Sequence, residues 1–178
     1  MRILTLLAMA LATAACSKEQ APAQPSSPAP ATALESPLEE ALARARSLDA
    51  GRDRLQAVPG TFTAGDASAR YVAYWHSGVL RLIDERSDFG DYGSSSARYY
   101  LDTTGALFLY EAMDERAVTD PSHAGAREKI EIRMVFDPGS RMLASEKKVD
   151  GKVQPVQATE IEGVREHLQA LKASAARR

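Results

Sequence analysis

The feature that most constrains the fold is a two-residue alternation of apolar and polar side chains, which begins near residue 67 and is broken at short intervals. Alternation with this period places the apolar side chains on one face of a β-strand. The breaks fall at Ser77-Gly78, Asp102 to Gly105, Asp137 to Gly139 and Asp150-Gly151. Short breaks that contain Gly connect antiparallel neighbours, so the segment predicts an antiparallel β-meander of about six or seven strands.

An amphipathic helix is expected before the meander and another after it. Ser36 to Glu39 has the residues of a capping box with Pro in the first turn, and the apolar stripe that follows runs to Leu55. Pro59-Gly60 is the expected stop of this helix. Thr159 to Glu162 begins the second helix in the same way. The predicted class is therefore α+β, with both helices covering one face of the sheet.

The part of the chain before the first helix has a different composition. Residues 1–15 start with Met1-Arg2 and continue as an uncharged run rich in Leu and Ala. This run makes about 20 Å of helix, which is too short for a hydrocarbon core of about 30 Å but suits the apolar part of a secretory signal. Cys16 is the only cysteine, and residues 17–35 are mostly Pro, Ala and Ser, which predicts an extended tether.

Residues 1–16 resemble the signal of a bacterial lipoprotein, with small residues before Cys16 and Thr13 where Leu is usual. The resemblance implies cleavage before Cys16 and attachment of a diacylglyceryl group and an N-acyl chain there. Ser17 in the next place implies sorting to the outer membrane, with the domain on its periplasmic face. The alternative is ordinary secretion after Ala12-Thr13-Ala14, which would leave Cys16 as a free thiol.

These segments give the domain plan and exclude one class of partner. We expect a signal at 1–15, a lipidated Cys with its tether at 16–35, one α+β domain at 36–174 and a frayed tail at 175–178. The chain has 22 Lys and Arg against 24 Asp and Glu. Because nucleic-acid-binding proteins usually carry a basic face, nucleic acid is not expected as a partner. The membrane is the expected partner of the lipid anchor.

The search for catalytic and metal-binding motifs finds none. The three histidines, His76, His123 and His167, have no ligand spacing, and neither a nucleophile elbow nor a phosphate loop occurs. The acidic stretch from Asp84 to Asp91 is interrupted by Arg86 and is expected to be a solvated loop rather than a calcium site. The sequence therefore predicts no cofactor, no metal and no enzyme. A hydrolase whose site is assembled from distant residues stays open as an alternative.

Two resemblances concern the domain. The stretch from Tyr99 to Asp102, with Gly105 and Leu107 after it, is similar to strands of small uncharacterised lipoproteins of Gram-negative bacteria, which implies no activity. Ser95 to Tyr99, followed by Thr103 to Gly105, is similar to a motif of membrane-bound inhibitors of c-type lysozyme, although their paired cysteines are missing. That similarity implies that Ser95 and Arg98 enter a lysozyme cleft. The expected function is a lipid-anchored binding or structural module with an envelope protein or glycan partner, and lysozyme inhibition is an alternative.

The expected hairpin registers single out one face of the sheet. A two-residue loop at Ser77-Gly78 would pair Tyr74 with Arg81 across the strands. A three-residue loop at Thr103 to Gly105 would place Tyr100 opposite Phe108 and Arg98 opposite Tyr110, so that both hairpins set an Arg beside a Tyr on the second face. Such side chains are enriched at interfaces. The predicted partner-binding face consists of Tyr74, Arg81, Arg98, Tyr100, Phe108 and Tyr110. This prediction requires exposed Tyr100 and Phe108 rings, and the alternative is that a helix lies across them.

Overall fold

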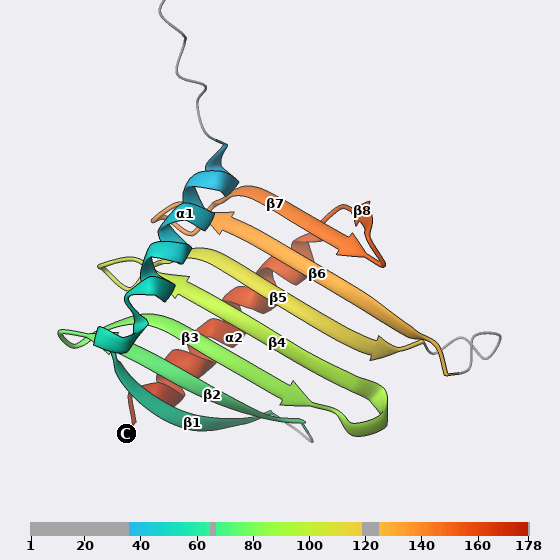
Figure 1. Ribbon diagram of the computed structural model, residues 1–178, viewed down its shortest axis with the longest axis horizontal. Helices are drawn as coiled ribbons and strands as arrows, with labels where there is room; N and C mark the ends of the chain where they lie inside the picture. Colours follow the sequence, from blue (N-terminus) through green and yellow to red (C-terminus); the bar gives the residue numbers. More distant parts are fainter. Residues whose placement is uncertain (1–35, 65–66, 119–124, 178) are drawn as a thin grey trace, which may run out of the picture. The chain divides into compact units, whose positions relative to one another are not determined.

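The computed structural model describes residues 36–64, 67–118 and 125–177. The predicted signal, Cys16 and tether lie outside the described residues. One antiparallel sheet of eight strands in sequence order has a helix before it and a helix after it (Figure 1). The elements are α1 Pro37–Ala50, η1 Arg52–Arg54, β1 Gln56–Ala64, β2 Ala67–His76, β3 Val79–Asp88, η2 Gly90–Tyr92, β4 Gly93–Leu101, β5 Leu107–Ala117, β6 Arg127–Phe136, β7 Met142–Val149, β8 Lys152–Gln154 and α2 Ala158–Ala175. The predicted α+β class is confirmed, with slightly more strands than expected. Within the described ranges, neither helix is long and apolar enough to cross a membrane.

Helix α1 begins as predicted but ends earlier. The Glu39 backbone N–H donates to Ser36 Oγ at 3.3 Å, and the Ser36 N–H donates to the Glu39 carboxylate at 3.1 Å, which completes the capping box. Gly51 caps the helix at its C-terminus, so Leu55 lies outside it. Pro59-Gly60, expected as the helix stop, belongs to strand β1 instead. Strand β1 is at the edge of the sheet and pairs only with β2. An edge strand tolerates proline, because a residue without a backbone N–H can sit where no second neighbouring strand needs a donor.

Helix α2 differs from the prediction at both ends. It begins at Ala158, where the backbone N–H of Gln157 donates to the Glu160 carboxylate at 2.7 Å, so the cap lies two residues before Thr159. The helix continues to Ala175, which is buried. The packed domain therefore extends one residue beyond the predicted boundary at 174.

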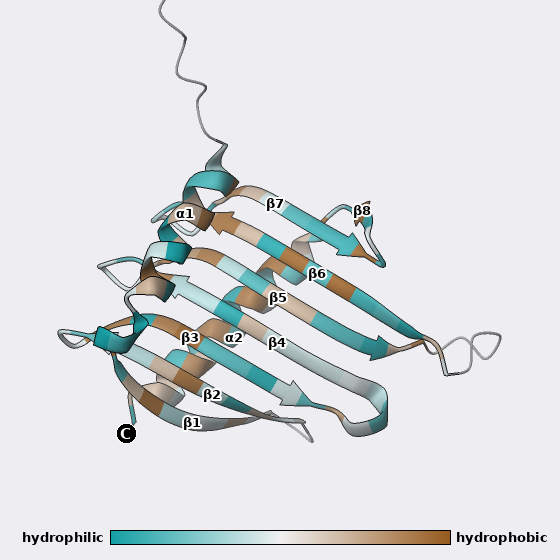
Figure 2. Ribbon diagram, in the orientation of Figure 1, coloured by the Kyte–Doolittle hydropathy of each residue, from teal (hydrophilic) through white to brown (hydrophobic). Residues whose placement is uncertain are grey.

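The two helices lie on opposite faces of the sheet, so the expectation that both cover one face is wrong (Figure 1). On the α1 face, Ala41 and Ala45 of the helix pack with Leu82, Tyr100, Phe108, Leu109 and Val135. On the α2 face, the helix contributes Val164, Leu168, Leu171 and Ala175 to a larger core with Tyr71, Ile83, Tyr99, Met134 and Phe136. Strands β3, β5 and β6 are hydrophobic where they lie next to α1, and β3 and β5 become hydrophilic toward their other ends (Figure 2).

A β-bulge beside the turn of each main hairpin explains this two-sided core. Tyr74 pairs with Leu82 while Trp75 pairs with Leu80, so Arg81 is an extra residue in β3. The same pattern makes Phe108 extra in β5 and Leu143 extra in β7. Because one extra residue moves every later side chain to the other face, a bulge turns part of an apolar run toward each helix.

The bulges overturn the registers expected from the sequence. Leu80 lies in the α2 core but Leu82 lies in the α1 core, although a simple alternation places both on one face. Tyr110 is opposite Tyr99 on the α2 face rather than opposite Arg98. The predicted pairs ignored the extra residue in each hairpin, and each was therefore wrong by one position.

Gly93, the first residue of β4, lies very close to the backbone of β5. Its φ is 129°, and a Cβ there would collide with the backbone carbonyl oxygen of Glu115. We expect Gly93→Ala to lower the free energy of unfolding by about 2–4 kcal/mol, as measured by urea denaturation. Gly78→Ala is the matched control, because Gly78 also has positive φ but a Cβ there meets nothing within 4 Å. That control should lose only about 1 kcal/mol, and equal losses in the two variants would contradict the clash.

Candidate binding groove

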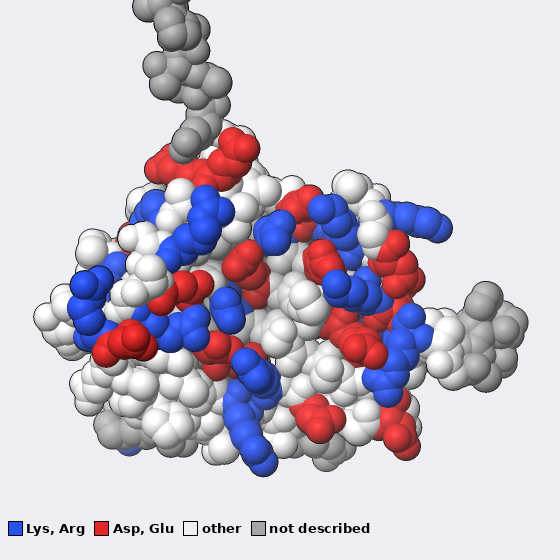
Figure 3. Space-filling view, viewed as in Figure 1, with Lys and Arg blue, Asp and Glu red and all other residues white. Residues whose placement is uncertain are grey.

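The half of the α1 face that the helix leaves uncovered forms an open groove with a volume of 1290 Å³. Strands β2 to β7 supply most of its surface. Figure 3 shows Lys, Arg, Asp and Glu side chains interleaved over this face. We call it the charged groove, and its charged residues are Arg52, Arg70, Asp84, Arg86, Asp88, Arg98, Glu111, Glu115, Glu131, Arg133, Glu146 and Lys148. Met113, which is 49% exposed, also lines it.

Charges of alternating sign form a row across the strands of the groove. The strand register places each member directly opposite the next, in the order Asp84, Arg98, Glu111, Arg133 and Glu146. Arg133 donates to Glu111 and to Glu146, each at 3.1 Å. Opposite charges directly across two strands contribute about 0.2–1 kcal/mol per pair. We call this row the charge ladder.

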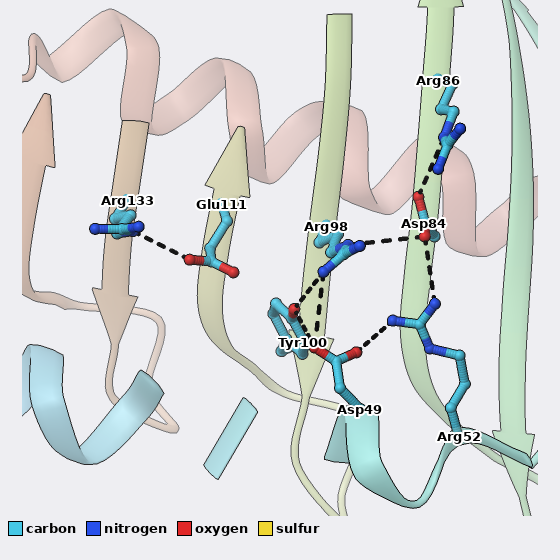
Figure 4. Close-up of polar contacts among 8 residues, drawn as sticks. All are labelled: Asp49, Arg52, Asp84, Arg86, Arg98, Tyr100, Glu111 and Arg133. Atoms are coloured by element: carbon cyan, nitrogen blue, oxygen red, sulfur yellow. Dashed lines mark hydrogen bonds and ion pairs between the residues drawn. The ribbon is translucent and has the colours of Figure 1, made fainter. Parts of the chain in front are cut away.

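Arg98 turns toward the end of α1 (Figure 4). Its guanidinium lies 3.7 Å from Asp49, 3.7 Å from Asp84 and 3.5 Å from the Tyr100 hydroxyl. The Tyr100 hydroxyl donates to Asp49 at 3.0 Å, and Arg52 also pairs with Asp49. These contacts fix the last turn of α1 against β4, and they form the wall of the groove nearest the helix.

Asp84 lies near three arginines but is too far from each of them for a short ion pair. It is largely buried, with the guanidinium of Arg52 at 3.7 Å, of Arg98 at 3.7 Å and of Arg86 at 4.0 Å (Figure 4). A charge-assisted hydrogen bond is shorter, at about 2.7–2.9 Å. Asp49 is a second carboxylate for Arg52 and Arg98, so two carboxylates face three guanidinium groups at this end of the groove, and Arg86 has only the long contact with Asp84.

The predicted aromatic face is covered. Tyr100 is 1% exposed and Phe108 is 6% exposed, because both pack beneath Ala41 and Ala45 of α1. The guanidinium of Arg44 also lies 4.1 Å above the centre of the Phe108 ring. The condition for an aromatic binding platform therefore fails, and the prediction of that platform is wrong. The apolar side of α1 packs on the Tyr100 and Phe108 rings and thereby removes them from solvent.

The other predicted members of that face separate. Tyr74 packs at the edge of the α1 core, with the Arg52 guanidinium 5.4 Å from its ring centre. The guanidinium of Arg81, at a bulge, donates to the Leu101 carbonyl at 3.3 Å. Tyr110 lies on the α2 face. Of the six predicted residues, only Tyr74 and Arg98 line the charged groove.

Sequence reasoning missed the charged groove because it placed the acidic stretch in a loop. Asp84, Glu85 and Asp88 belong to strand β3, so the expectation of a solvated loop there is wrong. Asp84 faces the groove while Glu85 is buried on the α2 face. Over the ranges that the structure describes, no group of three or more His, Cys, Asp and Glu residues is arranged to hold a metal ion.

A second polar cluster ties α2 to the sheet. His167 Nε2 lies 2.9 Å from both carboxylate oxygens of Glu85, which is 5% exposed, and the Tyr99 hydroxyl donates to Glu85 at 3.3 Å. Burial, reinforced by the charge of Glu85, raises the pKa of Tyr99. Nearby, the Ser95 hydroxyl donates at 2.6 Å to Asp114 rather than to the imidazole. A hydrolytic serine needs its base as that acceptor, so the cluster fits a structural tie better than a catalytic pair.

The residues implied by the similarity to lysozyme inhibitors also separate. Ser95 and Arg98 both lie within strand β4, and not in a projecting loop. Ser95 and Arg98 are three positions apart in the strand, so their side chains point to opposite faces: Ser95 donates to Asp114, whereas Arg98 pairs with Asp49 and Asp84. The two side chains therefore cannot enter a single cleft together.

Comparison with protein-family models, with curated proteins and with solved structures finds no match for this chain. The charged groove itself offers three features that bear on function: a row of paired charges, an end rich in arginine, and the exposed Met113.

The buried Tyr100 hydroxyl predicts a loss of stability at high pH. Burial raises the pKa of Tyr100 from 10.0 to about 12. The negative charge of Asp49 adds to this increase, and the hydrogen bond from Arg98 opposes it. Above pH 10 the unfolded chain releases a proton that the folded chain keeps. The free energy of unfolding should therefore fall as pH rises from 10 through 12.

Tyr100→Phe should flatten this decline, as measured by urea denaturation at pH 8, 10 and 11. A residual decline should remain, because burial also raises the pKa of Tyr99 and of Tyr110. Tyr92→Phe removes an exposed hydroxyl and should keep the wild-type decline. An unchanged pH profile in Tyr100→Phe would show that this hydroxyl is not held neutral by the fold.

Proposed function

We propose that the protein is a lipid-anchored binding module of the cell envelope, which holds a protein or glycan partner in the charged groove and performs no catalysis. The proposal places it at the outer membrane, on the periplasmic face. One observation carries the binding role. Half of the α1 face is covered by a helix, while the other half carries an ordered charge ladder with no helix above it among the described residues.

The size and composition of the groove support a macromolecular partner. Its volume of 1290 Å³ exceeds the range of about 300–1,000 Å³ that is usual for small-molecule pockets. Arg and Met are enriched at protein interfaces, and complementary charges direct encounter and specificity. Arg98, Arg133 and Met113 are side chains of these types, and they lie on the neighbouring strands β4, β6 and β5. The groove therefore suits an extended polar segment lying across the strands.

The anchor rests on the sequence before the domain. Cys16 follows an apolar run and small residues, and lipidation would use the only cysteine of the chain. Three acyl chains exceed the two signals that stable anchoring requires. A Pro-rich tether at about 3.1 Å per residue would allow the groove to reach partners some tens of ångströms from the membrane.

Cys16→Ala tests the anchor. The variant should lose labelling by a radioactive or alkynyl fatty acid and should move from the membrane fraction to the soluble periplasmic fraction. The wild-type chain, fractionated in parallel, is the control. Retention of the variant in the membrane, with labelling unchanged, would reject lipidation at this residue.

A photo-crosslinking amino acid at Met113 tests the groove. In intact cells it should give a discrete adduct with one partner, identified by mass spectrometry, because Met113 is exposed within the groove. The same amino acid at Glu166, which is exposed on α2, is the control and should give no such adduct. Glu131→Lys, directly opposite Met113, should reduce the Met113 adduct severalfold by reversing a groove charge. Equal adducts from both positions would reject the groove as the binding surface.

A further inference from the structure

We propose that one end of the charged groove binds a phosphate group, either on a soluble phosphate ester or on a lipid headgroup. This end, the arginine end, is formed by Arg52, Arg70, Arg86 and Arg98. The inference rests on the proposed function, since it names the chemistry that the same groove would recognise.

The first observation is a pair of like charges that face each other. Arg70 of β2 and Arg86 of β3 are directly opposite in the register and lie on the same face. Like charges in this position destabilise a sheet. The Arg86 side chain is 77% exposed, and its ion pair with Asp84 is long at 4.0 Å. Among the described residues, no carboxylate lies within 4.0 Å of Arg70. An anion between the two guanidinium groups would remove their repulsion.

The second observation is the charge balance at this end. Three guanidinium groups, those of Arg52, Arg86 and Arg98, lie within 4.0 Å of the two carboxylates of Asp49 and Asp84. Arg70 adds a fourth positive charge, so the formal excess at this end is +2. Asp88, one row beyond Arg86 along β3, also lines the groove and reduces the formal excess to +1. A phosphate monoester carries about −1.5 to −2 at pH 7, so a single group of this kind would balance the arginine end.

The third observation is the supply of suitable donors. The planar guanidinium of arginine presents two N–H groups that match two phosphate oxygens. Five serines line the groove, and among them Ser68, Ser94 and Ser96 alternate along their strands in step with Arg70, Arg86 and Arg98. Ser96 is directly opposite Arg86, and its only described hydrogen bond is long, at 3.5 Å to the Met113 carbonyl. A phosphate placed between Arg70 and Arg86 would therefore have hydroxyl donors next to it.

The rest of the groove limits the ligand to a single anionic group. Strands β5 to β7 contribute four carboxylates to the groove against two basic side chains, so an extended polyanion would be repelled there. The carboxylates are those of Glu111, Glu115, Glu131 and Glu146. A nucleic acid lying across the strands is thereby disfavoured. A phosphate at one end of an otherwise neutral or cationic ligand fits both halves of the groove.

The test uses the full chain carrying Cys16→Ala, so that it can be purified without lipid. Glucose 6-phosphate and inorganic phosphate are titrated by calorimetry at low salt, and vesicles of phosphatidylcholine with or without phosphatidic acid are tested by co-sedimentation. The chain should bind at least one phosphate probe. Arg70→Gln and Arg86→Gln should each weaken that binding by about tenfold. Stronger binding to the phosphatidic acid vesicles would assign a headgroup, and stronger binding to glucose 6-phosphate would assign a soluble ester.

Matched variants separate a site from general charge. Arg46→Gln removes the same charge from the exposed side of α1 and should leave binding unchanged. Asp84→Asn should strengthen binding, because it removes a carboxylate that competes with the ligand. Arg86→Lys keeps the charge but loses the paired donors, and it should recover only part of the affinity. Circular dichroism spectra that match wild type qualify each variant for comparison.

Two results would overturn the inference. One is the absence of binding to every phosphate probe, and the other is an equal loss of binding in Arg46→Gln and Arg86→Gln. If the Met113 adduct persists in either case, the groove remains a binding surface and only the phosphate site is rejected. If phosphate binds at the arginine end but Met113 gives no adduct, the envelope partner is rejected and the phosphate site stands.

Discussion

The β-bulges beside the hairpin turns are the constraint on which the rest of the structure depends. With strict alternation, each strand would offer apolar side chains to one face only, and the second helix would have no apolar surface to cover. The extra residues Arg81, Phe108 and Leu143 shift the following side chains by one position. Leu82 and Leu109 consequently join the α1 core while Leu80 and Leu107 stay in the α2 core. One meander thereby accommodates a helix on each face.

The position of the bulges also divides the α1 face into an apolar half that α1 covers and a charged half that it leaves uncovered. Since they lie beside the turns, the apolar surface for α1 is confined to the turn end of the strands, and the opposite half keeps the polar side of the alternation. Asp49 at the end of α1 joins the halves, because it accepts the Tyr100 hydroxyl from the packed half and pairs with Arg98 of the groove. Substitution of an exposed side chain in the uncovered half, such as Arg86, should therefore have little effect on the core.

The sequence predicts the parts of this fold that depend on local chemistry. The Ser36 capping box, the Gly-containing turns and the antiparallel order follow from residues within a few positions of one another. The bulges do not, because an apolar run such as Leu107 to Leu109 is compatible with several registers and only the packing of α1 selects one. Strand β1 was missed because Pro59-Gly60 normally ends an element and is tolerated here only at a sheet edge. The His167–Glu85 contact joins residues 82 positions apart and has no local pattern.

Most charges of the charged groove are neutralised by opposite charges on the neighbouring strands. Arg133 has carboxylates on both neighbouring strands, so this part of the charge ladder needs no partner to be stable. Among the described residues of the groove, the register sets like charges directly opposite each other at Arg70 and Arg86, one row beyond Asp84. Both side chains are exposed, so the high dielectric constant of water weakens their repulsion. The fold is therefore stable without a ligand. At the proposed phosphate site, an incoming anion would remove a local repulsion and would not complete the fold, which would make its binding reversible.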